Sequence, residues 1–198
     1  TLIRDLQQEF GNDKLTFYPG VSYRNLLVLH GKEFSSAIDY FKPDSSQDIP
    51  VAELRLSAAD NSPEAAYTVQ FVHDLMQRCA QFLQRHPLNQ GKASPANSIW
   101  PWSPGHAPKL PSFSARYNGA KGAIISAVDV IKGLGKCTGM TVINVPGATG
   151  YIDTNYAGKV EAALKAIKDH DFVYVHVEAI DECSHEGDLK LKLQSSAK

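Results

Sequence analysis

The first sixty residues combine one amphipathic segment with two short apolar runs. Residues 2–10 place apolar side chains at helical spacing and end at Gly11, which predicts a short helix. The apolar runs at residues 14–18 and 23–30 are joined across Pro19-Gly20, and this pattern predicts a turn with a strand on each side. Residues 41–50 are rich in Pro, Asp and Ser and predict a loop.

A long helix is predicted to follow. Ser62 is a good N-cap, Pro63 suits the first helical position, and Glu64 places an acid in the first turn. Apolar residues then recur at spacings of four and three at Ala65, Val69, Val72, Met76, Cys79 and Leu83. These residues should face a core, and the helix should end at His86-Pro87.

The second half of the chain alternates strand-like and helix-like patterns. Strands are predicted at 121–126, 141–145 and 172–177, and helices at 127–135 and 154–169. This order is typical of right-handed crossovers in a parallel sheet with helices on its faces. Since the apolar runs are continuous rather than alternating, we expect strands buried on both sides.

The two halves are separated by an irregular segment. Residues 89–111 contain many Gly, Pro, Ser and Asn residues together with two Trp, and regular structure does not tolerate that density of Pro. We therefore predict two domains, an α+β domain at residues 1–94 and an α/β domain at residues 95–198.

Composition and charge narrow the classes of partner. The 198 residues are 43% hydrophobic, and 20 Lys+Arg against 21 Asp+Glu give a net charge of −1. This balance argues against nucleic acid or an acidic membrane as the main partner. No stretch approaches the roughly 20 apolar residues of a membrane span. Three cysteines without CxxC spacing fit a reducing cytoplasm and buried or incidental thiols.

The candidate chemistry lies after the third predicted strand of the second half. Ligands of open parallel sheets bind beyond the carboxyl ends of the strands. There Asp181 and His185 stand four residues apart and can reach one ion from one helical face, and this donor pair suits Mn²⁺ or Zn²⁺. The alternative is a solvated acidic helix start with Asp181 as N-cap. Cys183 should point away from the pair.

Two further features could bind an anion. Residues 146–151 form a Gly-rich turn before a helix, but they lack the Lys of a P-loop and the GxGxxG spacing, so a plain tight turn is the simpler interpretation. Arg24 follows a strong turn and could bind a phosphate through two hydrogen bonds, or it could form an ordinary surface ion pair.

Several segments in order resemble one known family, the archaeal-type branch of the cofactor-independent (2,3-bisphosphoglycerate-independent) phosphoglycerate mutases, within the alkaline phosphatase superfamily. The resemblance rests on FYPGVSYRNLLVL (17–29), PANSIWPW (95–102), LPSF (110–113), KGAIISAVDVIKGLG (121–135), VPGATGYIDTNY (145–156) and DFVYVHVEAIDECSHEGD (171–188). It covers nearly the whole chain apart from about residues 33–62. It implies an alkaline-phosphatase-like core, here partial, with an inserted α+β domain at residues 1–94.

The resemblance also implies a reaction. In this family two divalent metals, often Mn²⁺, flank a serine that accepts the phosphoryl group of 3-phosphoglycerate and returns it to the other hydroxyl, as bimetallic phosphoryl transfer requires. The family's metal-ligand pair falls on Asp181 and His185. Residues that match substrate-binding motifs are Arg24, Asn97, Asp129, Lys132 and Asn155.

The resemblance leaves part of the family's machinery outside this chain. The nucleophilic serine and the first metal-binding Asp lie upstream of these motifs in the family, and an Asp-His pair and a last His lie downstream. We therefore expect a fragment without a catalytic residue of its own, with no mutase activity and weak metal binding. Ile180, where the family usually has Pro, and Asn25, where His is common, are departures that affect pocket geometry.

Other functions remain as alternatives. Related bacterial proteins resemble proposed homoserine kinases and share the same motifs, and a non-catalytic binding module belongs to another class. We expect a small phosphorylated substrate, a cytoplasmic location, Mn²⁺ with Zn²⁺ or Mg²⁺ as alternatives, and neither nucleic acid nor membrane as a partner.

Overall fold

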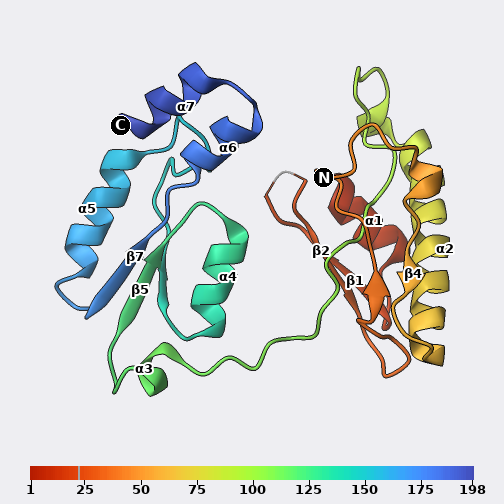
Figure 1. Ribbon diagram of the computed structural model, residues 1–198, viewed down its shortest axis with the longest axis horizontal. Helices are drawn as coiled ribbons and strands as arrows, with labels where there is room; N and C mark the ends of the chain where they lie inside the picture. Colours follow the sequence, from red (N-terminus) through yellow and green to blue (C-terminus); the bar gives the residue numbers. More distant parts are fainter. Residues whose placement is uncertain (22) are drawn as a thin grey trace. The chain divides into compact units, whose positions relative to one another are not determined.

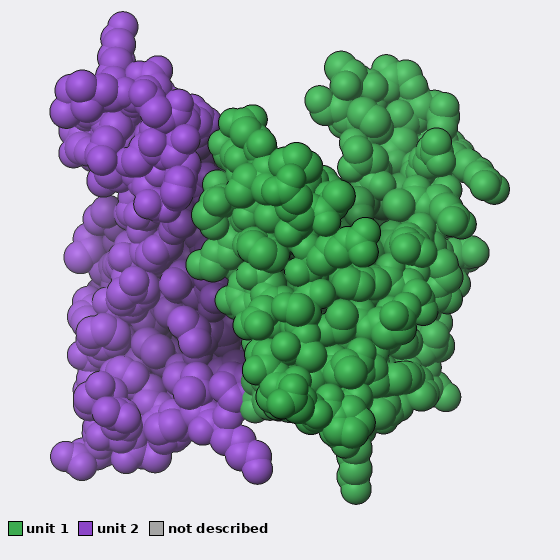
Figure 2. All heavy atoms as spheres, turned by 45° about the vertical axis from the view of Figure 1, so that its right-hand side comes forward, with its two compact units in different colours: residues 1–107 green, residues 108–198 purple. Residues whose placement is uncertain are grey.

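The computed structural model describes residues 1–21 and 23–198 and divides into two compact units, residues 1–107 and residues 108–198 (Figure 2). The predicted turn after Pro19-Gly20 passes through Ser22, which lies outside the described residues. Segment 95–107 belongs to the first unit and is hydrogen-bonded within it, since Trp100 Nε1 donates to the Phe41 carbonyl oxygen at 2.9 Å. The assignment of residues 1–94 and 95–198 as inserted domain and partial core stays a prediction.

The first unit is built on helices α1 and α2 and a strand pair (Figure 1). Its elements are α1 (Leu2–Phe10), β1 (Leu15–Tyr18), β2 (Leu26–Leu29), β3 (Ile38–Asp39), the 3-10 helix η1 (Val51–Glu53), β4 (Ser57–Ala58), α2 (Pro63–Arg85) and the 3-10 helix η2 (Pro87–Asn89). Strands β1 and β2 pair antiparallel with Leu15 opposite Leu29, and β3 pairs antiparallel with β4. The predicted first helix and the two strands predicted on either side of Pro19-Gly20 are therefore confirmed.

Helix α2 follows the sequence pattern closely. The Ser62 Oγ accepts a hydrogen bond from the Ala65 N–H at 3.2 Å, as predicted for an N-cap, and the helix ends before His86. Its fully buried positions include Thr68 and Leu75, while the predicted Val69 and Met76 are only partly buried. The core of the first unit comprises Leu6, Leu15, Phe17, Leu75, Cys79 and Leu83.

The second unit is the predicted α/β arrangement. Its elements are α3 (Phe113–Arg116), β5 (Gly122–Ile125), α4 (Asp129–Cys137), β6 (Thr141–Ile143), α5 (Tyr156–Ala166), β7 (Phe172–Val175), α6 (Ala179–His185) and α7 (Leu189–Ser196). The three strands form one parallel sheet in the order β6-β5-β7, with Ile125 beside both Ile143 and Val175.

Helices cover both faces of the central strand. Helix α4 packs on β5 and β6, helix α5 packs on β5 and β7, and the two helices lie on opposite sides of the sheet (Figure 1). All four residues of β5 are buried, as predicted for a strand covered on both faces. The same prediction is wrong for β6 and β7 within the described chain, because these are outer strands and expose side chains such as Phe172 and Tyr174.

Helix α5 turns an unexpected side toward the sheet. Lys159 and Ala166 are buried, whereas the larger apolar side chains Val160, Leu164 and Ile167 are each more than half exposed. Among the described residues, no helix combines the length and apolar character needed to cross a membrane.

Candidate metal centre

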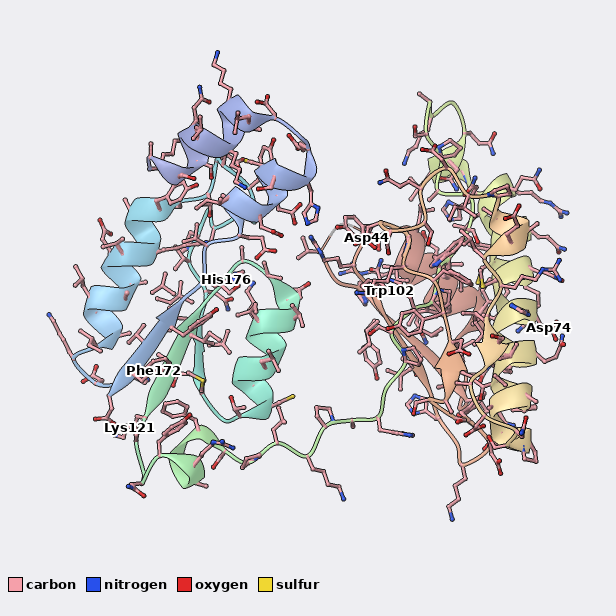
Figure 3. The ribbon with its side chains drawn as sticks, in the orientation of Figure 1. Asp44, Asp74, Trp102, Lys121, Phe172 and His176 are labelled. Atoms are coloured by element: carbon pink, nitrogen blue, oxygen red, sulfur yellow. The ribbon has the colours of Figure 1, made fainter. Side chains whose placement is uncertain are left out.

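The site lies at the edge of the sheet where the three parallel strands end. The chain leaves β5 toward one face of the sheet and reaches β7 from the other, so the strand order reverses between β5 and β7. In open α/β sheets this reversal marks the crevice where ligands bind. Ser126 follows β5 and His176 follows β7, at the opposite end of β7 from Phe172 (Figure 3).

Helix α6 presents the predicted ligand pair on one face. Asp181 and His185 stand one helical turn apart, and His185 Nε2 lies 3.4 Å from Asp181 Oδ2. Both side chains are well exposed, at 65% and 70% respectively. Donor atoms that each lie about 2.1 Å from one ion stand about 3.0–3.4 Å apart, so the carboxylate and the imidazole fit the coordination of a shared divalent cation.

The opposite face of α6 is apolar and buried. Ala179 and Cys183 have 1% and 0% exposure, so the Cys183 thiol points into the unit and away from Asp181 and His185. This agrees with the prediction that Cys183 does not share their face. Buried cysteines also include Cys79, whereas Cys137 is exposed.

The predicted pair would be only part of a metal-ligand set. Within residues 1–21 and 23–198, no group of three or more His, Cys, Asp or Glu side chains is placed to hold a metal ion. Two ligands form half of the usual four-coordinate shell of a zinc site. The pair therefore fits a metal by donor chemistry and spacing, with further ligands required from elsewhere.

A cluster of polar side chains lies where β5 and β7 end, directly before the start of α6 in the chain. His176 Nδ1 lies 3.3 Å from the Ser126 Oγ, and its Nε2 lies 3.0 Å from Glu178 Oε2. Lys159 on helix α5 also contacts this cluster, because its Nζ donates to the backbone carbonyl of His176 at 2.9 Å. Lys159 is 2% exposed, and its burial lowers the pKa of the ammonium group, while the nearby Glu178 carboxylate opposes that shift.

The sequence reasoning did not select any of these four residues. Ser126 and His176 lie within the predicted strands 121–126 and 172–177, and Glu178 stands directly after the second of these. Lys159 was hidden by the stronger apolar pattern on the opposite side of its helix. A usable signal was the spacing of Lys159, Ala162, Ala163 and Ala166, which forms a narrow face of small residues interrupted by one charge.

The Gly-rich segment after β6 is a tight turn. Gly147 has a φ of 72°, and the amides of Ala148, Thr149 and Tyr151 donate to acceptors on Val145, Thr154 and Thr149 respectively. Asn155 closes the turn, because its Oδ1 accepts from the Gly158 N–H and its Nδ2 donates to the Pro146 carbonyl, both at 2.9 Å. This geometry favours the simpler interpretation over an open anion cradle and gives Asn155 the role of N-cap of α5.

Tyr151 joins this turn to the segment after α6. Its hydroxyl donates to Glu186 Oε2 at 2.7 Å, and this bond to a carboxylate raises the pKa of Tyr151 to about 12. Because Glu186 follows His185 directly, the bond fixes the chain immediately beyond the predicted ligand.

The other predicted substrate residues are distributed over both units. Asp129 and Lys132 lie in the first turn of α4, in the same unit as Asp181 and His185. Arg24 and Asn97 belong to the first unit. The Arg24 guanidinium lies 4.8 Å from the centre of the Tyr23 ring. Asn97 lines a surface cavity of about 490 Å³ beside the end of α2. Their roles toward a substrate stay predictions.

The chain belongs to the Metalloenzyme superfamily, whose family profile matches residues 23–195. Membership of this superfamily implies dependence on a divalent metal.

Relatives of known name narrow the class further. The chain is 42% identical over 199 residues to the 2,3-bisphosphoglycerate-independent phosphoglycerate mutase of Methanosarcina acetivorans, covering 98% of this chain and 47% of that protein. It is 46% identical over 182 residues to the enzyme of the same name from Methanothrix thermoacetophila, covering 90% and 43%. The chain thus spans about half the length of the curated relatives it matches.

Comparison with solved structures supports the same fold and family. The cofactor-independent phosphoglycerate mutase of Thermoplasma acidophilum superposes with a TM-score of 0.57 at 25% identity, covering 99% of this chain and 52% of that one. A Pyrococcus horikoshii protein gives a TM-score of 0.58 at 28% identity, covering 68% and 36%. These findings confirm the predicted fold class and the predicted resemblance.

Proposed function

We propose that the complete polypeptide containing this chain is a metal-dependent phosphoglycerate mutase that interconverts 3-phosphoglycerate and 2-phosphoglycerate, a small phosphorylated substrate. The observation that supports this most directly is the Asp181–His185 pair, held on one face of α6 at the carboxyl edge of the sheet. The names of the curated relatives favour a mutase over a homoserine kinase or a non-catalytic module.

The geometry of the chain supports the following roles in this proposal. Asp181 and His185 would hold one ion of a two-metal site, with Mn²⁺ preferred and Zn²⁺ or Mg²⁺ as alternatives. When bound, divalent ions neutralise phosphoryl charge and lower the pKa of the attacking hydroxyl. The helix α6 backbone orients the two donors before any ion arrives, and Tyr151 restrains the chain beyond His185 through Glu186.

The remaining parts of the reaction lie outside these residues in this proposal. The serine that carries the phosphoryl group and the other metal ligands are expected in the rest of the polypeptide, as the family resemblance implies. Arg24, Asn97, Asp129, Lys132 and Asn155 are proposed to shape the substrate pocket. A cytoplasmic location and the absence of nucleic-acid or membrane partners remain predictions from charge and composition.

A coupled assay of the full-length protein tests the proposal. We expect turnover of 3-phosphoglycerate with Mn²⁺, and we expect Asp181→Asn and His185→Gln each to lower kcat/KM by at least about 100-fold, because each removes a metal ligand. Glu182→Gln, an exposed change on the same helix, serves as the control and should retain activity.

Two results would contradict the proposal. One is a full-length protein that turns over homoserine and ATP but not phosphoglycerate, which would favour the kinase-like alternative. The other is unchanged activity and metal content in Asp181→Asn, which would remove Asp181 from the site.

A further inference from the structure

Lys159 is a buried charge that the proposed chemistry does not use. It is 2% exposed and lies on the side of α5 that also carries the buried Ala166. Burying an ammonium group costs free energy unless it is paired and hydrogen-bonded, and an apolar side chain would fill the same space at lower cost. A lysine at this position therefore requires a reason in its contacts.

Those contacts lead to the junction between β7 and α6. The Lys159 Nζ donates to the His176 carbonyl at 2.9 Å, and the His176 N–H donates to the Ile125 carbonyl at 2.8 Å. Both backbone groups of His176 are thus held, one by helix α5 and the other by the central strand β5. His176 is the residue at which the chain leaves the sheet (Figure 3).

The imidazole of His176 extends this set of contacts to Glu178. It lies between the Ser126 Oγ at 3.3 Å and the Glu178 carboxylate at 3.0 Å, so the side chain of Glu178 is held against the end of the sheet. The Glu178 carboxylate is also the negative charge that acts on the buried Lys159.

The backbone of Glu178 then sets the start of α6. Its carbonyl oxygen accepts hydrogen bonds from the Asp181 N–H at 2.9 Å and the Glu182 N–H at 3.2 Å. An unbroken series of contacts therefore runs from Lys159 through His176 and Glu178 to the backbone of Asp181. Because α6 has only seven residues, its direction depends strongly on how its first turn is held.

We infer that Lys159 and Glu178 are positioning residues, which clamp the β7–α6 junction so that Asp181 and His185 are held ready for a metal ion. The clamp itself stands on the contacts above, and only its consequence for metal binding rests on the proposed function. Outer-shell groups of this kind typically change metal affinity by about 10–100-fold when removed.

The test uses the full-length protein and two independent measurements. The first is the Mn²⁺ dissociation constant, from electron paramagnetic resonance of free Mn²⁺ during titration. The second is hydrogen exchange of the amides of residues 179–185 without metal. Lys159→Met keeps the length of the side chain but removes the charge, and Lys165→Met, an exposed lysine on the same helix, is the matched control.

We expect Lys159→Met to weaken Mn²⁺ binding by at least about tenfold and to speed amide exchange in residues 179–185, while Lys165→Met changes neither. Glu178→Gln, which keeps the shape of a partly exposed side chain, should act in the same direction. If Lys159→Met does not fold, Glu178→Gln alone decides the question.

The outcomes separate this inference from the proposed function. The clamp would be overturned if the wild-type protein binds Mn²⁺ and if both Lys159→Met and Glu178→Gln leave the Mn²⁺ affinity and the amide exchange of residues 179–185 unchanged. A wild-type protein that binds no Mn²⁺ would overturn the metal-dependent function instead, and the exchange measurement would still support or overturn the clamp.

Discussion

Tyr151 shows how a single hydrogen bond links two loops at the proposed site. Its hydroxyl donates to the Glu186 carboxylate at 2.7 Å, and the neutral phenol is favoured because ionisation would place two negative charges in contact. The pKa of Tyr151 is therefore raised to about 12 in the folded protein, against about 10 in an unfolded chain.

This shift predicts a defined pH dependence of stability. Since the folded state retains the proton more strongly, the contribution of Tyr151 is fully present below about pH 10 and is lost as the pH rises from about 10 to 12. Urea unfolding should show a stability difference between wild type and Tyr151→Phe that is constant below pH 10 and shrinks above it. The same variant should lack the phenolate absorbance step near pH 12; a step unchanged in Tyr151→Phe would show that another tyrosine carries it.

At the scale of one element, helix α4 lies close to the sheet because it lacks a side chain at one position. A Cβ at Gly135 would stand 2.6 Å from Ile124 Cγ2 and 3.1 Å from Val142 Cγ2, both on β-branched side chains of the sheet. Gly133, two residues earlier, is exposed, and a Cβ added there would meet no neighbouring atom within 4 Å.

The two glycines make a matched pair for a stability measurement. Gly135→Ala should lower the free energy of unfolding by about 1–3 kcal/mol, because the sheet side chains have to move. Gly133→Ala should raise it by roughly 0.5–1 kcal/mol, because alanine favours the helix and meets no neighbour. Chemical denaturation of the 198-residue chain measures both, and an equal effect of the two changes would contradict this packing of α4.

The 198-residue chain folds as two compact units and carries two of the predicted metal ligands, Asp181 and His185. The two donors on α6 provide too few bonds to hold an exposed ion firmly. We expect the isolated chain to show no turnover of 3-phosphoglycerate and to remain largely free of Mn²⁺ at concentrations that saturate the full-length protein. Equilibrium dialysis and the coupled assay check this expectation, and detectable turnover by the chain alone would overturn it.

Much of the local structure, and the family, could be predicted from the order of residues alone. The capped helix at Ser62, the strand–helix alternation after residue 120 and the placement of Asp181 and His185 one turn apart all follow from short-range patterns. Such patterns act within a few residues, through caps, turns and periodic apolar faces, and therefore remain readable without coordinates. The matched motifs added the family.

Which faces are buried, and which distant residues meet, depends instead on how the elements pack together. The apolar side of α5 stays exposed while Lys159 is buried, because the narrow row of alanines fits the sheet better than the wider Val160–Leu164 side. Ser126 and His176 are fifty residues apart in the chain, and they meet because parallel pairing brings the ends of β5 and β7 to one edge. Burial and long-range contact depend on how elements pack, and local sequence patterns do not contain that information.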